Sequence, residues 1–452
     1  MKDLTQGNIW KNLFWYAIPT IFSYLLSNAY SIVDSAMVGQ FVGEVGLASI
    51  GCTESYLSFL GQLINGGCFG FSLYYGALIS KKRNKEAVVA LKSNIPVLIG
   101  VAFSISLVSI VFYKPIFALL KINNEIQSDA LTYYVIIFTM RIFSTFNVIS
   151  NHIFNVSGMP SFSMKRSIIT CVINITLNYV FMKIFKWGVF GAGFATALAV
   201  LVIFVLNVFT LKKLIKSLSP EKEKFRFDKQ SVAKAWKMAI PCMLQQGVMY
   251  FSSATVQPVI NSLDTSSIAS YSISMKLFNL CSLFFYASSH SLATFCTQCY
   301  GNGKVNLVKK GFFSSLILGI CFAMPMLLFI YLFPHLAGGI FLKDGNQATL
   351  LLVVRYVKIC FPFILILILN NFYHNFYKGV MVPHFATITT AVYTVSRIAF
   401  TYLLTPTMLM NGVYFAFIIS WIIEFVICTI IYLSKKWKTP KFKEMEKALK
   451  QN

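Results

Sequence analysis

Twelve long apolar stretches constrain the fold of this chain more than any other feature. They lie at 13–38, 48–79, 94–114, 131–153, 166–186, 189–211, 236–262, 267–299, 310–333, 352–376, 384–405 and 411–433. Each is long enough to cross about 30 Å of hydrocarbon as an α-helix. Of the 452 residues 12% are charged, against about 25% in soluble domains. The sequence therefore predicts an all-α integral membrane protein with twelve transmembrane helices, and its composition excludes a soluble enzyme.

The net charge of +24 is concentrated in alternate segments between the apolar stretches. The basic segments carry Lys81, Lys82, Arg83 and Lys85; Lys165 and Arg166; Lys212, Lys213 and Lys216; Lys304, Lys309 and Lys310; and Lys435, Lys436 and Lys438. This is the positive-inside pattern of a multi-pass protein, not the surface of a nucleic-acid-binding protein. We therefore expect a plasma-membrane protein with both termini in the cytoplasm, whose partner is the lipid bilayer.

The chain contains an internal repeat. Ala48-Ser49 recurs as Ala269-Ser270, Tyr75-Gly76 as Tyr300-Gly301, and Gly158 as Gly379, with offsets between 221 and 226 residues over all the matches. Six spans per half is an even number, so the halves are parallel repeats with the substrate expected between them. We predict an N-terminal six-helix lobe at 1–216, a cytoplasmic linker at 217–234 and a C-terminal six-helix lobe at 235–452.

Asp34 is the only acidic residue in the first apolar stretch. A carboxylate at membrane depth is costly and is either functional or in reach of water. Both explanations stay open from position alone: a cation or proton site, or a residue near the helix end. Tyr30 and Asp34 are four residues apart, as are Asn174 and Asn178, so each pair shares a helical face. The two asparagines either complete such a site or connect helices.

Several motifs in both halves resemble those of MATE (multidrug and toxic compound extrusion) transporters, and in particular of their DinF-like branch. They are Pro19, Asp34-Ser35-Ala36-Met37-Val38-Gly39-Gln40, Ser157-Gly158-Met159-Pro160, Asn174-Ile175-Thr176-Leu177-Asn178-Tyr179, Gly191-Ala192-Gly193, Ile240-Pro241, Gln245-Gln246 and Gly412-Val413-Tyr414. The resemblance implies two pseudo-symmetric six-helix lobes and export of amphipathic, cationic organic compounds in exchange for H⁺ or Na⁺. It implies no enzymatic activity and no cofactor, and we expect a monomer.

The resemblance also implies a cation site in the N-terminal lobe. Carried over residue by residue, it consists of Asp34, Tyr30, Tyr133, Asn174, Asn178 and Thr196. Some family members have an acidic residue where this chain has Asn178, and others have acidic residues where it has Gln245, Gln246, Asn370 and Asn371. Because Na⁺ prefers several oxygen ligands and charge, these departures favour H⁺, with Na⁺ at Asp34 as the alternative.

Four further charged residues within apolar stretches are candidate cavity residues: Glu54, Lys276, Arg141 and Arg397. With an offset of 222 residues Glu54 corresponds to Lys276, so the two either pair across the cavity or reach water separately. The cationic residues keep a second cargo open, a lipid-linked saccharide moved by the same fold. A channel or receptor is a further alternative, which the two-fold repeat disfavours. No P-loop occurs, which disfavours an ATP-driven pump, and Cys296 and Cys299 form a lone C-x-x-C that predicts no metal.

Overall fold

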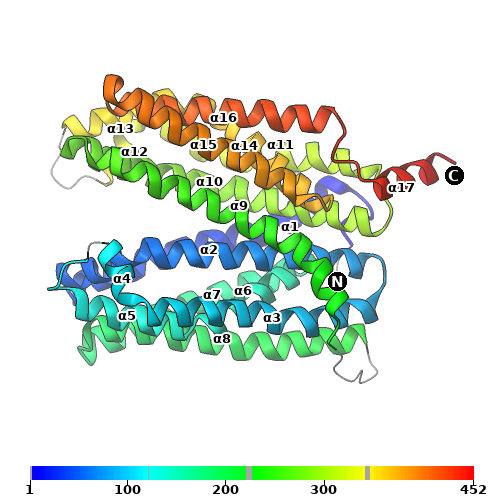
Figure 1. The fold of residues 1–452 in the computed structure, drawn as a ribbon, viewed down its shortest axis with the longest axis horizontal. Coiled ribbons are helices and arrows are strands. Elements are labelled where there is room, and N and C mark those ends of the chain that lie inside the picture. Colours follow the sequence, from blue (N-terminus) through cyan, green and yellow to red (C-terminus); the bar gives the residue numbers. More distant parts are fainter. Residues whose placement is uncertain (1–2, 121, 220–226, 342–346, 452) are drawn as a thin grey trace. The chain divides into compact units, whose positions relative to one another are not determined.

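The computed structural model describes residues 3–120, 122–219, 227–341 and 347–451 (Figure 1). For residues 28, 30, 31, 44, 450 and 451 it describes the main chain only. All elements in this part of the chain are helical, which confirms the predicted all-α class.

The first half contains helices over each of its six predicted spans. They are α1 (Ile9–Phe41), α2 (Glu44–Ser80), α3 (Asn84–Val111), α4 (Tyr113–Leu119), α5 (Gln127–Thr139), α6 (Arg141–Val156), α7 (Pro160–Asn178), the π-helical η1 (Tyr179–Ile184) and α8 (Gly188–Leu218). Pro160 is the first residue of α7, a position where its missing N–H costs no hydrogen bond.

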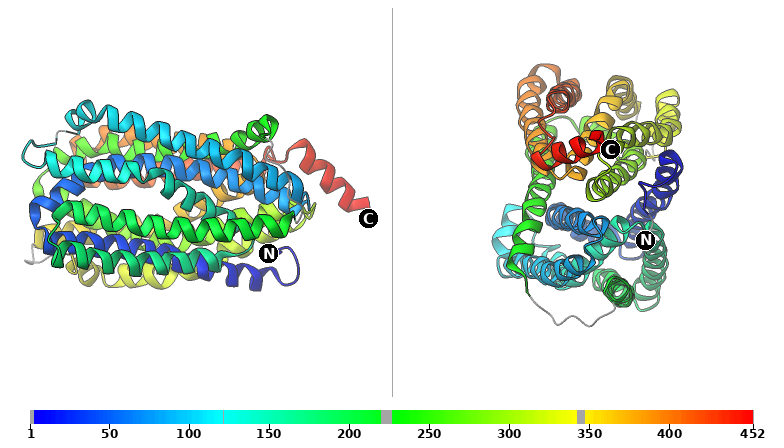
Figure 2. Two further views of the ribbon diagram at one scale, coloured as in Figure 1. Left: turned by 90° about the horizontal axis from the view of Figure 1, so that it is seen from below. Right: turned by 90° about the vertical axis from the view of Figure 1, so that its right-hand side faces the viewer.

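The second half repeats this order. It contains α9 (Lys229–Asn261), α10 (Thr265–Gly301), α11 (Leu307–Leu332), α12 (Pro334–Gly339), α13 (Gln347–Cys360), the 3₁₀ turn η2 (Phe361–Phe363), α14 (Ile364–Gly379), α15 (Pro383–Met408) and α16 (Met410–Leu433). A short helix follows, α17 (Pro440–Gln451), which the apolar pattern did not predict and which turns away from the line of α16 (Figure 2). Its polar composition explains why a search for apolar stretches passes over it.

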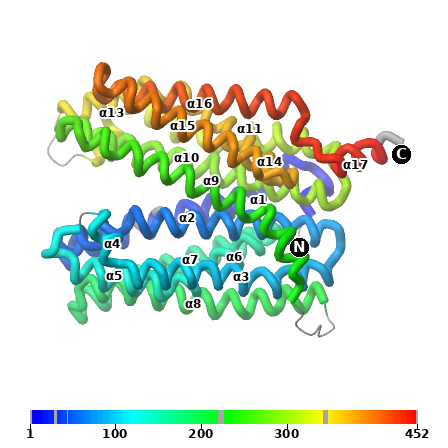
Figure 3. Tube along the Cα trace, in the orientation of Figure 1, coloured from blue at the N-terminus to red at the C-terminus, as the bar shows by residue number. Residues whose placement is uncertain are grey.

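The fourth predicted span of each half is divided. In the first half α5 and α6 are bent by 49° at their junction, and in the second η2 separates α13 from α14. Pro362 lies in η2 and cannot donate a main-chain hydrogen bond, which explains the break there. The predicted spans 131–153 and 352–376 are therefore each built from two helices, a path that can be followed along the trace in Figure 3.

By length and composition, seven helices in the described residues can cross a membrane, or eight if α5 and α6 form one span. Four other predicted spans lie in α1, α2, α9 and α15, which carry Asp34, Glu54, Gln245 and Arg397 respectively.

The chain folds into two compact units, which differ in extent from the predicted lobes. Unit 1 includes Ile18–Met243, and unit 2 includes Asp3–Ala17 and Leu244–Asn452. The start of α1 belongs to unit 2 because the main-chain N–H of Leu4 donates to Oε1 of Gln298 at 2.8 Å, and Leu13 is buried in the core of that unit. The predicted lobes 1–216 and 235–452 stay a prediction.

The predicted linker at 217–234 stays a prediction, and helices reach into both of its described ends. Helix α8 continues to Leu218 and α9 begins at Lys229, so both described ends of the linker are helical. Residues 220–226 lie outside the described part of the chain. The charged residues after 228 are polar, as is typical of a connector, but they form the first turns of α9.

Glycines allow close helix contacts within each unit. A Cβ on Gly70 of α2 would lie 2.5 Å from the carbonyl oxygen of Met238 in α9. In unit 2 a Cβ on Gly379 would lie 2.6 Å from Cβ of Cys296 and 2.7 Å from the carbonyl oxygen of Ala293. Such approaches are typical of membrane helices, whose association depends on packing because lipid is as apolar as the side chains.

Candidate functional site

A chain of polar side chains in unit 1 connects α1, α7 and α8. Nδ2 of Asn178 donates a hydrogen bond to Oδ1 of Asp34. The same nitrogen also donates to Oδ1 of Asn174, over a distance of 2.9 Å. Nδ2 of Asn174 in turn donates to Oγ1 of Thr196 at 3.2 Å. Asn174 and Asn178 are 1% and 0% exposed. Four of the six residues expected in the N-terminal site are therefore linked by hydrogen bonds.

The local fold explains how these groups meet. Asn174 and Asn178 share one face of α7, and the chain passes into the π-helical η1 directly after Asn178. Such π-helical turns are frequent at functional sites. A Cβ on Gly191 would lie 3.2 Å from the carbonyl oxygen of Phe181. This glycine therefore allows α8, which carries Thr196, to pack closely against η1.

A cavity of about 270 Å³ lies beside this chain of polar groups, within unit 1. Asp34, Glu54, Tyr133 and Arg141 all line it. Tyr133, the fifth expected site residue, therefore shares the cavity with Asp34. The side chain of Tyr30, the sixth, lies outside the part of the chain that the structure describes.

Arg141 is the positive charge of this cavity. Nη2 of Arg141 donates to the carbonyl oxygen of Leu57 at 3.3 Å, and its Cζ lies 5.3 Å from the ring centroid of Phe138. Its buried Nε has no hydrogen-bond partner among the described residues. Two carboxylates and one guanidinium therefore face one small cavity.

The pairing predicted for Glu54 and Lys276 stays a prediction. Glu54 lines the cavity of unit 1, whereas Lys276 belongs to unit 2, where its Nζ lies 5.5 Å from the ring centroid of Phe341. Each charge thus has a described environment within its own unit.

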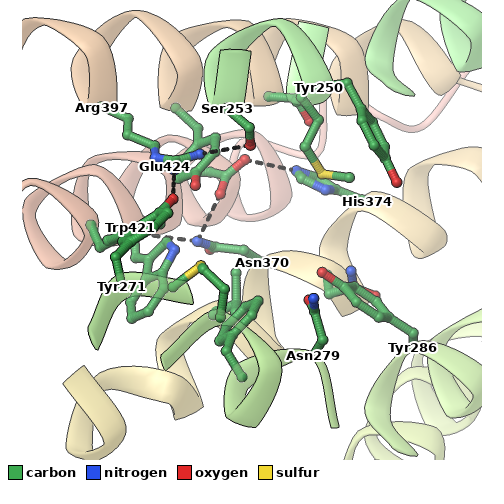
Figure 4. Close-up of a pocket in the computed structure, with 18 residues that line it drawn as sticks. Tyr250, Ser253, Tyr271, Asn279, Tyr286, Asn370, His374, Arg397, Trp421 and Glu424 are labelled. Carbon is green, nitrogen blue, oxygen red and sulfur yellow. Dashed lines mark hydrogen bonds and ion pairs between the residues drawn. The ribbon is translucent and has the colours of Figure 1, made fainter. Parts of the chain in front are cut away.

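Unit 2 contains a second cavity, of about 350 Å³ (Figure 4). Glu424 of α16, 3% exposed, lines it, and its Oε1 lies 3.1 Å from Nε2 of His374 on α14. Its Oε2 accepts a hydrogen bond from Nδ2 of Asn370 at 3.0 Å. Asn370 also donates to the carbonyl oxygen of Trp421 at 3.0 Å. Both oxygens of this buried carboxylate therefore have partners.

The sequence reasoning missed Glu424 and His374. Glu424 is the only acidic residue of the predicted span 411–433, which is the same signal that singled out Asp34 in the first span. His374 lies near the end of the predicted span 352–376. Nothing in the spacing of these two residues, which lie on different helices, indicates that they meet.

Arg397 of α15 lines the cavity of unit 2 as well. It is 4% exposed, and its Cζ lies 4.3 Å from the ring centroid of Phe417. Of the two arginines expected at cavities, one therefore lies in each unit.

The group that faces the carboxylate of Asp34 is a hydrogen-bond donor. Nδ2 of Asn178 lies between two acceptors, the carboxylate of Asp34 and the amide oxygen of Asn174, so a donor and not an oxygen faces the carboxylate. Hard cations prefer several oxygen ligands. No group of three or more His, Cys, Asp or Glu residues suited to a metal ion occurs among the residues described.

A family model described as MatE matches residues 19–180 and 241–403, one match in each half. The chain is 23% identical over 313 residues to the probable multidrug resistance protein YpnP of Bacillus subtilis. The matched region covers 67% of this chain and 67% of that protein. It is 22% identical over 376 residues to the multidrug export protein MepA of Staphylococcus aureus, or 79% of this chain and 81% of that one.

Two solved structures show the same fold. A variant of the Vibrio cholerae MATE transporter VcmN matches with a TM-score of 0.87 at 16% identity, over 96% of this chain and 98% of that one. A MOP superfamily transporter from Pyrococcus furiosus matches with a TM-score of 0.85 at 16% identity, over 95% of this chain and 98% of that one.

Proposed function

Because this chain belongs to the MatE family of multidrug and toxic compound extrusion transporters, we propose that it is a secondary active multidrug exporter. The chain is thus a membrane transporter and not an enzyme. In the proposal it exports amphipathic organic cations in exchange for protons, by alternating access. The protein acts in the plasma membrane as a monomer with both termini in the cytoplasm. Its assignment to the DinF-like branch stays a prediction.

The observation that carries the proposal is the position of Asp34, hydrogen-bonded to Asn178 on one side and lining a cavity on the other. A cavity lets protons reach the carboxylate, and α7 holds a donor that recognises its charged form. Protonation removes the charge and weakens the charge-assisted hydrogen bond from Asn178. The contact between α1 and α7 therefore depends on whether Asp34 carries a proton.

Coupling requires that the proton and the substrate favour different conformations. Protonated Asp34 releases its contact with α7 and favours the conformation that discharges the substrate. Loss of the proton to the cytoplasm restores the contact and the affinity for the next substrate. The proton is the coupling ion because Asn178 offers a donor, and not a second carboxylate, at this position.

Transport by purified protein in proteoliposomes tests the proposal. A pH jump should drive uphill accumulation of ethidium with wild-type protein. Asp34→Asn should fold, because the amide is nearly isosteric and costs less to bury than a carboxylate, yet it cannot exchange a proton. We expect pH-driven accumulation to vanish in Asp34→Asn and to persist in Asp129→Asn, which changes an exposed acid at the start of α5. Undiminished accumulation in Asp34→Asn would remove Asp34 from the mechanism.

A further inference from the structure

Arg397 is a buried cation whose hydrogen-bond partners are all neutral hydroxyl groups. Its Nη1 lies 3.4 Å from Oγ of Ser252 and 3.4 Å from Oγ of Ser253, and its Nη2 lies 3.3 Å from the hydroxyl of Tyr271. The hydroxyl of Tyr393 is a further partner of the guanidinium. All three distances exceed the usual length of about 2.9 Å for such bonds. The buried Nε of Arg397 has no hydrogen-bond partner in the part of the chain that is described.

A guanidinium in this position has unused capacity to bind an anion. It carries five N–H donors that match a carboxylate in a two-pronged geometry. A buried charge within a membrane helix normally has a counter-ion or a wet cavity beside it. The carboxylate in the same cavity, Glu424, accepts one hydrogen bond from Asn370 and lies 3.1 Å from His374, with its two oxygens turned toward these two residues (Figure 4).

The walls of the cavity suit an aromatic molecule. Seven Tyr, Phe and Trp side chains line it: Tyr250, Tyr271, Phe278, Tyr286, Tyr393, Phe417 and Trp421. The volume of about 350 Å³ lies within the range of sites for small organic ligands, which combine apolar walls with a few placed polar groups. Arg397 lies against Phe417 at one wall of this aromatic enclosure.

We propose that the cavity of unit 2 is an anion-binding subsite in which Arg397 pairs with the carboxylate of a zwitterionic aromatic substrate, one that carries a carboxylate besides its cationic group. This proposal depends on the proposed transport function in one respect only, namely that the bound molecule is a transported substrate. Both cavities contain a carboxylate and a guanidinium, but the only carboxylate at the unit 2 cavity among the described residues, Glu424, has partners at both of its oxygens, whereas Nε of Arg397 has none.

A pair of dyes isolates the contribution of the carboxylate. Tetramethylrhodamine has a free carboxylate, and tetramethylrhodamine methyl ester has the same ring system with that charge removed. Binding of each dye to the purified full chain in detergent is followed by fluorescence anisotropy. Arg397→Gln should weaken binding of the acid by at least about tenfold, the size expected for loss of one partner of a desolvated charge pair. Binding of the ester should change by less than about threefold, since it has no carboxylate to lose.

Two further variants keep the test decisive. Arg397→Lys retains the charge without the two-pronged geometry, and should lower affinity for the acid by less than Arg397→Gln does. Arg166→Gln removes a guanidinium that donates to Asn207 and Thr210 in unit 1, and should leave both affinities unchanged. If Arg397→Gln fails to purify as a monodisperse protein, a selective loss of acid binding in Arg397→Lys supports the subsite in its place.

Equal loss of both dyes in the Arg397 variants, or unchanged binding of the acid, would overturn the proposal. These titrations use no pH gradient. A failure here therefore leaves proton coupling through Asp34 untouched, and a failure of pH-driven transport leaves the dye selectivity intact.

Discussion

The side-chain amide of Asn178 donates a hydrogen bond to the carboxylate of Asp34, and with it joins the end of α7 to α1. The same nitrogen donates to Oδ1 of Asn174, which fixes the orientation of the amide. An amide in this orientation recognises a charged carboxylate but adds no negative charge for a metal ion. The identity of residue 178 therefore bears directly on which ion the site accepts.

Asn178→Asp should convert the site to one that binds Na⁺. Two carboxylates side by side repel each other, and a cation between them relieves that repulsion. Binding stabilises the folded state in proportion to the logarithm of ion concentration over Kd. We expect NaCl, compared with choline chloride, to raise the Tm of Asn178→Asp by roughly a few degrees.

Wild-type protein and Asn261→Asp are the controls for this measurement. Asn261 is exposed at the end of α9, so an added carboxylate there meets water. Neither protein should respond to Na⁺ beyond the response to choline. A specific Na⁺ stabilisation of the wild type would contradict the preference for protons.

The polar chain around Asp34 could be predicted from sequence because its members combine two simple signals. Asn174 and Asn178 are four residues apart on one helix, and Asp34 is alone in its span. The resemblance to a family then placed Thr196 with them. The hydrogen bonds agree with that grouping, because polar groups surrounded by hydrocarbon satisfy one another.

The contact between Glu424 and His374 in unit 2 could not be predicted in the same way. Glu424 and His374 lie on α16 and α14, and their contact depends on how these helices pack. The break between α5 and α6 lies at Met140, where no proline indicates a break in the helix from the sequence. The start of α9 also differs from the prediction, since this helix begins at Lys229, among charged residues that precede its apolar stretch.

The orientation of the protein in the membrane can be determined with two single-cysteine variants made in a cysteine-free background. Ser217 is exposed near the end of α8, and Ser262 is exposed between α9 and α10. From the basic segments we expect Ser217→Cys to react with a membrane-impermeant maleimide only after the cells are permeabilised. Ser262→Cys should react in intact cells. The reverse pattern would invert the topology.

Close packing at Gly379 should make even a methyl group costly. The Cβ of Gly379→Ala would meet Cβ of Cys296 and the main chain at Ala293, neither of which can move without shifting a helix. We expect a loss of roughly 1 to 3 kcal/mol in the free energy of unfolding, seen as a lower Tm in detergent. Gly51→Ala is the matched control, since its Cβ would meet nothing within 4 Å. It should be neutral or stabilising by up to about 1 kcal/mol through helix propensity.

The pair formed by Glu424 and His374 should be strongly coupled in stability. His374→Leu leaves a buried carboxylate with only Asn370 as a partner, and we expect a loss of about 3 kcal/mol. Glu424→Gln alone should cost less, because it removes the charge and keeps the shape. The double variant should lose clearly less than the sum of the two, since no unpaired charge remains. His384→Leu, at an exposed histidine near the start of α15, controls for loss of an imidazole. Denaturant or thermal unfolding of the four proteins completes the cycle, and strict additivity would show that the two side chains act independently.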